Sequence, residues 1–357
     1  MDQKLISKLD KRKQNHTLRF LSIPEGSIDF FSNDYLGLAQ IKDHSIEQSK
    51  RFGATGSRLL SGNSNEALQA EKSIASFFDS ESSLVFNSGY NANLALMSSI
   101  PQRGDTVFFD EFVHASIRDG IRLSYANSIS FRHNDLNDLE KKIEKSEGTI
   151  YIVIESLYSM DGDMAPIKGI IDLAEKKGAF IIVDEAHAAG VFGWEGRGVI
   201  HGRELIEKVF ARVVTFGKAY GFHGAAILGS NELIKYLVNF ARPFIYTTAL
   251  PITDYCEIEK KILRTDIRER QKKLHENIAY FRSKLKLNTT SEINSPIQVF
   301  QHKSKDEVLK KAADLSEIGI YSKPIFAPTV PEGKECIRLC FHSFNTFSEI
   351  DILLNSL

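Results

Sequence analysis

Six short apolar runs between positions 84 and 229 constrain the fold more than any other feature of the sequence. They lie at 84–86, 107–109, 150–154, 180–183, 213–214 and 226–228. Each run is short enough to be a strand, and none alternates with polar residues. A strand that is apolar on both faces belongs in a covered, mainly parallel sheet.

Helical patterns fill the stretches between these runs. Apolar residues recur every three or four positions in 67–78 and in 136–143, the spacing of one helix face. The segment 167–177 has the same spacing and is followed by Gly178, a typical helix end. The alternation predicts an α/β fold with a mainly parallel sheet, which binds ligands beyond the carboxyl ends of its strands.

Beyond residue 230 the pattern changes to that of a smaller α+β unit. Helices are predicted at 231–240, around Leu274, Ile278 and Phe281, and at 306–318, and strands at 296–300 and 337–341. The predicted domains are an N-terminal segment (1–40), a large α/β domain (41–250) and a small C-terminal α+β domain (251–357).

Composition excludes several classes of protein. The net charge is −1 and the pI about 6.8, so no basic surface for nucleic acid is expected. No apolar run approaches the roughly 20 residues of a membrane span, and no secretory pattern begins the chain. Three cysteines without metal-ligand company are expected to be buried free thiols, which favours the cytoplasm.

The segment 180–187 is the most informative one. An apolar strand ends in Asp184, and His187 follows three residues later. Asp-Glu-Ala-His also resembles the Walker B box of helicases, but the required phosphate loop, G-x-x-x-x-G-K-[ST], is missing from the sequence. Metal hydrolysis is disfavoured because the histidines are scattered and form no His-Glu-x-x-His motif, so no metal site is predicted.

Lys218 ends the next apolar strand and precedes a stretch too apolar and glycine-rich for a free surface. Partial desolvation favours the neutral amine of a lysine, which Schiff-base chemistry needs. A carboxylate on one strand and a lysine on the next are typical of enzymes that use pyridoxal phosphate (PLP). The sequence therefore predicts PLP as cofactor, with Asp184 at its pyridine nitrogen.

Ordered motifs then identify a family. The chain resembles the α-oxoamine synthases, fold-type I PLP enzymes, along nearly its whole length. The motifs that carry the resemblance are 31–38 (FSNDYLGL), 56–62 (GSRLLSG), 87–93 (NSGYNAN), 114–116 (HAS), 133–135 (HND), 159–163 (SMDGD), 184–187 (DEAH) and 215–218 (TFGK). The resemblance implies a fold-type I PLP transferase that works as a homodimer.

It also implies roles at the cofactor. Lys218 would bind PLP covalently and act as acid or base, while His187 would bond the phenolic oxygen and His114 would stack on the ring. The remaining implied cofactor contacts are Ser88, Gly89, Tyr90, Ser159, Thr215 and, from the partner subunit, Thr247 or Thr248.

Other implied contacts concern the substrates. Arg338 would bind the amino-acid carboxylate, since a guanidinium binds a carboxylate bidentately. Asn33 would lie beside it, and Arg19 and Thr329 would contact the acyl substrate. Glu155 ends its strand at the level of the site, where it serves either the site or the structure.

The reaction implied is the condensation of L-alanine with an acyl thioester on coenzyme A (CoA) or a carrier protein, as in biotin synthesis. Sister reactions use glycine with acetyl-CoA or succinyl-CoA, or serine with a fatty acyl-CoA. A non-catalytic interaction protein of this fold is disfavoured because both Lys218 and Asp184 are present. Departures from the family pattern, His223 and the segment 342–345 (HSFN), affect the acyl substrate more than the cofactor.

Overall fold

The computed structural model describes residues 2–15, 17–21, 28–41, 53–302, 304–327 and 329–357. A seven-stranded sheet forms its centre, in the order β2-β8-β7-β6-β5-β3-β4. The strands are β2 (Ser82–Phe86), β3 (Thr106–Asp110), β4 (Asn127–Phe131), β5 (Ile150–Glu155), β6 (Phe180–Asp184), β7 (Ala211–Thr215) and β8 (Ala225–Gly229). The predicted α/β class is confirmed.

One strand of this sheet runs against the others. Strands β3 to β7 pair in parallel, whereas β8 is antiparallel to both β2 and β7. The connection from β7 to β8 spans only 216–224, which is too short for a parallel crossover. A second difference from the prediction is β4, an edge strand whose mostly exposed, serine-rich residues hid it from a search for apolar runs.

Helices cover the large sheet, and several of them begin at a polar residue whose side chain caps the first turn, such as Ser64 and Ser88. They include α2 (Asn65–Phe77), α3 (Gly89–Ser99), α4 (Ala115–Leu123), α5 (Leu136–Ile143), α6 (Ile167–Lys177), α7 (Gly198–Gly202), α8 (Asn231–Phe240), α9 (Arg242–Ile245) and α10 (Ile252–Ile262). The predicted helix at 167–177 is α6, and Gly178 ends it in the left-handed conformation at φ 64°.

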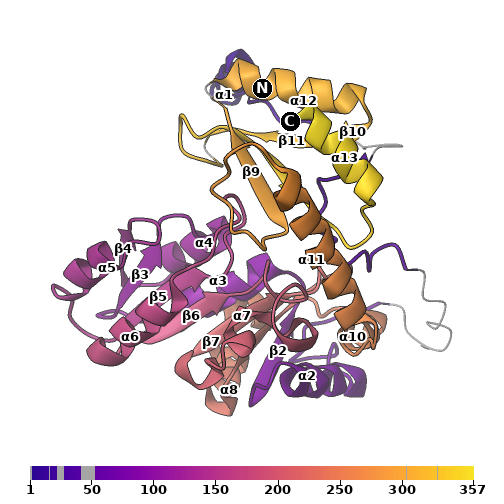
Figure 1. Ribbon diagram of the computed structural model, residues 1–357. Coiled ribbons are helices and arrows are strands. Elements are labelled where there is room, and N and C mark those ends of the chain that lie inside the picture. Colours follow the sequence, from indigo (N-terminus) through magenta and orange to yellow (C-terminus); the bar gives the residue numbers. More distant parts are fainter. Residues whose placement is uncertain (1, 16, 22–27, 42–52, 303, 328) are drawn as a thin grey trace.

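The C-terminal part forms a second, antiparallel sheet in the order β11-β12-β9. Its strands are β9 (Ile297–Gln301), β11 (Lys323–Ile325) and β12 (Cys336–Cys340), accompanied by α11 (Ile267–Lys284), α12 (Lys305–Glu317) and α13 (Phe347–Ser356). Figure 1 shows this unit beside one edge of the large sheet, with α11 running between the two. The exact domain boundaries at 40 and 250 stay predictions.

The N-terminal part of the chain joins this C-terminal unit. Strand β1 (Ile28–Asp29) pairs with β10 (Ile320–Tyr321), and α1 (Gln3–Gln14), which has no buried residue, lies near the same end of the molecule (Figure 1). The Cys340 amide donates to the Phe30 carbonyl at 2.7 Å. The segment that leads to Asn33 is therefore held by the last strand of the chain.

The cysteines differ partly from expectation. All three are free, and Cys336 and Cys340 are buried as predicted, but Cys256 is only half-buried.

In the part of the chain that the structure describes, no helix is both long and apolar enough to cross a membrane.

The two units meet at Gly162, which adopts a φ of +68°, and an alanine Cβ there would collide with the Ile297 carbonyl of β9. We expect Gly162→Ala to destabilise the protein more than Gly178→Ala, whose φ is +64° but whose Cβ would meet nothing. Left-handed backbone costs either alanine roughly 1–2 kcal/mol. Overpacking should add about 1–3 kcal/mol at Gly162 alone. Urea unfolding measures both, and equal losses would show that the contact with β9 is not tight.

Candidate active site

A pocket of about 240 Å³ lies at the carboxyl edge of the large sheet. The loops after β2, β3, β6 and β7 and the last residue of β5 contribute to it, as expected for a parallel sheet. Its lining residues are Asn33, Ser88, Gly89, Tyr90, Asn93, His114, Glu155, Asp184, Ala186, His187, Thr215, Gly217, Lys218, His223 and Gly224. Residues from five of the sequence motifs thus lie around one pocket.

Asp184 is held at the end of β6 with its carboxylate orientation fixed. One oxygen accepts the Ala186 amide at 2.8 Å, and the other accepts the Asn93 side-chain amide at 2.7 Å. Asp184 is 5% exposed, and no cation forms an ion pair with it among the described residues. A buried carboxylate fixed in this way can accept a hydrogen bond from a protonated ring nitrogen of a ligand.

Glu155 lies next to Asp184, because the ends of β5 and β6 are in register. It accepts the backbone amides of His114 at 2.6 Å and Ser159 at 3.3 Å, so it fixes two loops of the site. Burial and the neighbouring Asp184 charge raise the pKa of Glu155 well above its usual value. Of the two roles left open for Glu155, the structure shows a structural acceptor that also lines the pocket.

Lys218 follows β7 and is half-buried. In the described part of the chain its side-chain amine has no hydrogen bond or ion pair, although Asp184 and Glu155 lie close enough to act on it electrostatically. Burial lowers its pKa, against the opposing effect of these two carboxylates. The lowered pKa raises the fraction of neutral amine, the nucleophilic form.

Two of the histidines that line the pocket, His187 and His114, have lowered pKa values. Burial lowers the pKa of His187 well below its usual range, and the charges of Lys218 and Arg338 lower it further. Burial also lowers the pKa of His114, whose Nδ1 lies 2.7 Å from Ser116 Oγ at the start of α4. Neutral imidazoles can hydrogen-bond or stack without adding positive charge.

The first turn of α3 forms an anion cradle. Ser88 caps the helix by accepting the Asn91 amide at 3.2 Å, and Gly89 is the first helical residue. A Cβ at Gly89 would lie 2.7 Å from Thr215 Cγ2, so a side chain there would fill the space between helix and strand. Free amides at the N-terminus of an 11-residue helix suit a phosphate.

Arg338 is a buried guanidinium, 8% exposed, on β12. It donates to the Ser159 carbonyl at 2.7 Å and to Asn33 Oδ1 at 3.1 Å. No carboxylate lies within ion-pair distance of it among the residues described. Since a buried cation is costly without an anionic partner, this arrangement suits a ligand carboxylate.

Some residues chosen from the sequence lie outside the pocket lining. Ser159 reaches the site through its backbone contacts to Glu155 and Arg338. Thr247 is half-buried and Thr248 is exposed. Arg19 and Thr329 are exposed and bond each other, Nη2 to Oγ1 at 3.2 Å, although 310 positions separate them.

One functional residue was missed from the sequence. Asn93 donates to Asp184 and to Ser116 Oγ and is 3% exposed. It lies within the motif 87–93, four residues after Gly89, and therefore on the same face of α3. The four-residue spacing from Gly89 is the sequence feature that could have identified Asn93.

Among the described residues, no group of three or more His, Cys, Asp or Glu side chains is arranged so that it could hold a metal ion.

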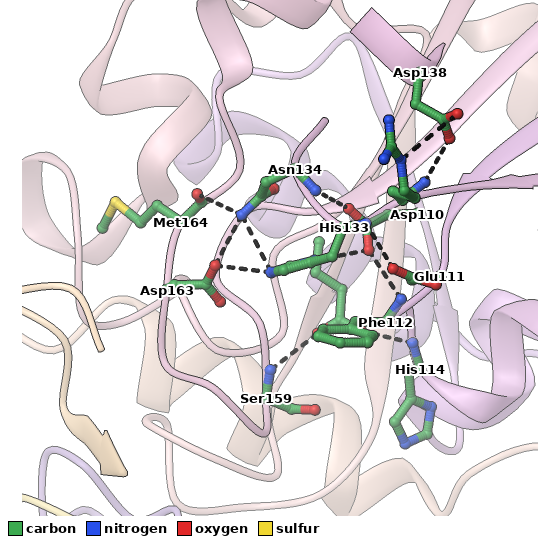
Figure 2. A network of polar contacts seen from close by, with 12 residues as sticks. Asp110, Glu111, Phe112, His114, His133, Asn134, Asp138, Ser159, Asp163 and Met164 are labelled. Carbon is green, nitrogen blue, oxygen red and sulfur yellow. Dashed lines mark hydrogen bonds and ion pairs between the residues drawn. The ribbon is translucent and has the colours of Figure 1, made fainter. Parts of the chain in front are cut away.

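A second polar network surrounds the loops that carry His114 and Ser159 (Figure 2). His133 lies between two carboxylates, with Nδ1 2.9 Å from Asp110 and Nε2 2.8 Å from Asp163. Its ring stacks on Phe112 at 4.4 Å. Burial alone would lower the pKa of His133, but the hydrogen bonds that its ring donates to Asp110 and Asp163 outweigh burial and raise the pKa to about 10. A cationic His133 therefore ties β3 and β4 to the loop before α6.

Comparison with known proteins gives consistent matches. The family model "Aminotransferase class I and II" matches residues 25–357. The 8-amino-7-oxononanoate synthase of Emericella nidulans is 38% identical, over 98% of this chain and 93% of its own. A solved structure of serine palmitoyltransferase (SPT) with PLP is 27% identical, with a TM-score of 0.91 over 99% of this chain and 96% of that one. The 8-amino-7-oxononanoate synthase of Francisella tularensis is 29% identical, with a TM-score of 0.78 over 93% and 97%.

The network around His133 predicts a pH-dependent stability. Because its pKa is raised, the stabilisation should be complete below about pH 6.5 and disappear as the pH rises through about 10. His133→Gln removes the charge and should cost roughly 1.5–3 kcal/mol at neutral pH, the value of a charged hydrogen bond. Urea unfolding of both proteins across this range tests it. A difference that stays constant up to pH 10.5 would contradict a charged His133.

Proposed function

The chain belongs to the aminotransferase class I and II family and is a PLP-dependent acyltransferase of the α-oxoamine synthase group, and from this premise we propose the reaction that it catalyses. It condenses L-alanine with a pimeloyl thioester, on CoA or a carrier protein, to 8-amino-7-oxononanoate, a step of biotin synthesis. The family expected from the ordered motifs is confirmed.

The observation that carries the proposal is that one pocket holds a lysine whose amine has no hydrogen-bond partner among the described residues, a carboxylate of fixed orientation and a neutral histidine. Lys218, Asp184 and His187 all line it. Similarity to two enzymes named 8-amino-7-oxononanoate synthase then supports this reaction over its sister reactions. The likeness to SPT keeps a serine-using enzyme as the alternative.

The pocket residues fit PLP by their chemistry. Lys218 would bind it covalently through Nζ, Asp184 would pair with the pyridine nitrogen, and His187 would bond the phenolic oxygen. His114 would lie on the ring, and the amides of Ser88, Gly89 and Tyr90, with the hydroxyl of Thr215, would hold the phosphate. When bound, PLP supplies an electron sink that stabilises a carbanion at the amino-acid α-carbon.

The chain's own groups then direct the substrates. Arg338 binds the alanine carboxylate with Asn33 beside it, and Lys218 removes and returns the α-proton, as its lowered pKa permits. The α-carbon forms a bond to the thioester carbonyl carbon as the thiolate leaves. The bond to the carboxylate then breaks, carbon dioxide departs, and a proton takes its place.

The acyl chain is assigned to Arg19 and Thr329. These residues form an exposed contact between the N-terminal segment and the loop before β12. Both are accessible to a large carrier, as a thioester on CoA or a carrier protein requires. His342 and Asn345, which depart from the family pattern, bond Ser32 and Asp29 and so position the segment that carries Asn33.

We further propose that the enzyme is a homodimer in the cytoplasm. Leu59 is 50% exposed, Leu60 82% and Tyr246 74%. Their segments adjoin, since the Ala249 amide donates to the Gly56 carbonyl at 3.0 Å. Covering this apolar area with a second copy would bring Thr247 or Thr248 to the partner's phosphate site. Buried free thiols at Cys336 and Cys340 suit a reducing compartment.

The first experiment is the visible spectrum of the PLP-loaded protein, titrated in turn with L-alanine, glycine and L-serine. Mass spectrometry then identifies the products formed with pimeloyl-, acetyl-, succinyl- and palmitoyl-CoA. We expect the tightest response to alanine and the nine-carbon product. Lys218→Ala should lose the covalent band and all turnover. Preference for serine and palmitoyl-CoA would replace the proposed reaction, and full activity of Lys218→Ala would refute it.

A second prediction separates the two substrate sites. Arg338→Gln removes charged hydrogen bonds worth about 1.5–3 kcal/mol, so alanine should bind about 10- to 100-fold more weakly. Arg19→Gln should leave alanine binding unchanged and raise the KM for the thioester. Spectral titration and steady-state kinetics measure the two effects. Unchanged alanine affinity in Arg338→Gln would exclude Arg338 as the carboxylate site.

A further inference from the structure

Four side chains form a line of hydrogen bonds from the C-terminal sheet into the pocket. Arg338 Nη2 donates to Asn33 Oδ1 at 3.1 Å, Tyr35 Oη lies 3.1 Å from the same oxygen, and Tyr35 Oη lies 2.7 Å from His187 Nδ1. Tyr35 is fully buried. It belongs to the motif 31–38.

The single proton of the Tyr35 hydroxyl decides what His187 can do. His187 is neutral, so its ring carries one proton, on Nδ1 or on Nε2. If Tyr35 donates to Asn33, then His187 Nδ1 must carry the proton and donate to Tyr35. If Tyr35 donates to His187, then the proton of His187 is on Nε2.

Two observations favour the second arrangement. The contact to His187 is shorter by 0.4 Å, 2.7 against 3.1 Å. Asn33 Oδ1 already accepts a hydrogen bond from a cationic donor, Arg338, which weakens it as an acceptor for Tyr35. In this arrangement the Nε2–H of His187, which has no hydrogen-bond partner among the described side chains, is available to a ligand of the pocket.

We propose that Tyr35 is a positioning residue that donates its hydroxyl proton to His187 Nδ1 and thereby keeps the His187 proton on Nε2. Nε2–H then faces the pocket as a donor to an anionic oxygen. That this oxygen is the phenolic oxygen of PLP rests on the proposed function, whereas the tautomer itself does not.

The experiment is ¹⁵N NMR of histidine-labelled protein without added PLP, because bare and protonated ring nitrogens differ in shift. His187→Gln assigns the signal. We expect the wild type to hold its proton on Nε2, and Tyr35→Phe to convert this single form to a mixture. Tyr220→Phe, which removes another buried tyrosine hydroxyl, from Gly196, is the matched control and should match the wild type.

Two results would overturn the proposal: a wild-type proton on Nδ1, or an unchanged tautomer in Tyr35→Phe. The first is read from the wild type alone, so the proposal stays testable even if the variant fails to fold. Failure here leaves the proposed function standing, whereas a wild type that binds no PLP would refute the function and leave the tautomer result intact.

With PLP added, the two variants should also differ in their spectra. A donated hydrogen bond favours the charged form of an oxygen, so Tyr35→Phe should move the acid–base midpoint of the visible band to higher pH, by about one to two units. Tyr220→Phe should not move it. A midpoint that is the same in all three proteins would show that Tyr35 does not act on the bound cofactor through His187.

Discussion

Two buried carboxylates on neighbouring strands determine how the rest of the site is built. The register of β5 and β6 places Glu155 beside Asp184, and neither residue has an ion-pair partner among the described residues. Two negative charges on neighbouring residues raise the free energy of the folded protein unless hydrogen-bond donors surround them. Asn93 and three backbone amides compensate for these charges by donating hydrogen bonds to them, and each of these four donors thereby acquires a fixed place, while Lys218 acts on both carboxylates electrostatically. The loops that begin at His114 and Ser159 are positioned as part of this compensation.

The fold was predictable where burial alone decided the structure. Apolar runs without alternation located six of the strands of the large sheet, and Gly178 located the end of α6. Strand β4 escaped because an edge strand needs little apolar surface. The antiparallel direction of β8 escaped because side-chain pattern does not encode direction, which follows here from the shortness of the connection at 216–224.

At the site, sequence motifs identified which residues surround the pocket but not how they bond each other. Asp184 and Lys218 follow apolar strands and could be chosen by that rule. Asn93 could be chosen only by its helical spacing from Gly89, and Tyr35 could not be chosen at all; their importance lies in contacts to residues 91 and 152 positions away. Likewise, His342 and Asn345 seemed only to depart from a pattern, whereas in three dimensions they hold Ser32 and Asp29. Such contacts are set by tertiary structure and have no local sequence signature.

The bond between Arg338 and Asn33 joins residues 305 positions apart. A ribosome releases the chain from its N-terminus at about 5–20 residues per second. The strands at 82–229 can therefore pair while β10 and β12, the two strands that hold the segment at 28–35, are still to be synthesised. The nascent enzyme can form its sheet and the cradle at α3 early, but it completes the amino-acid carboxylate site only at the end of translation. Loss of the last strand would thus leave a largely folded protein in which Asn33 has lost its partner Arg338.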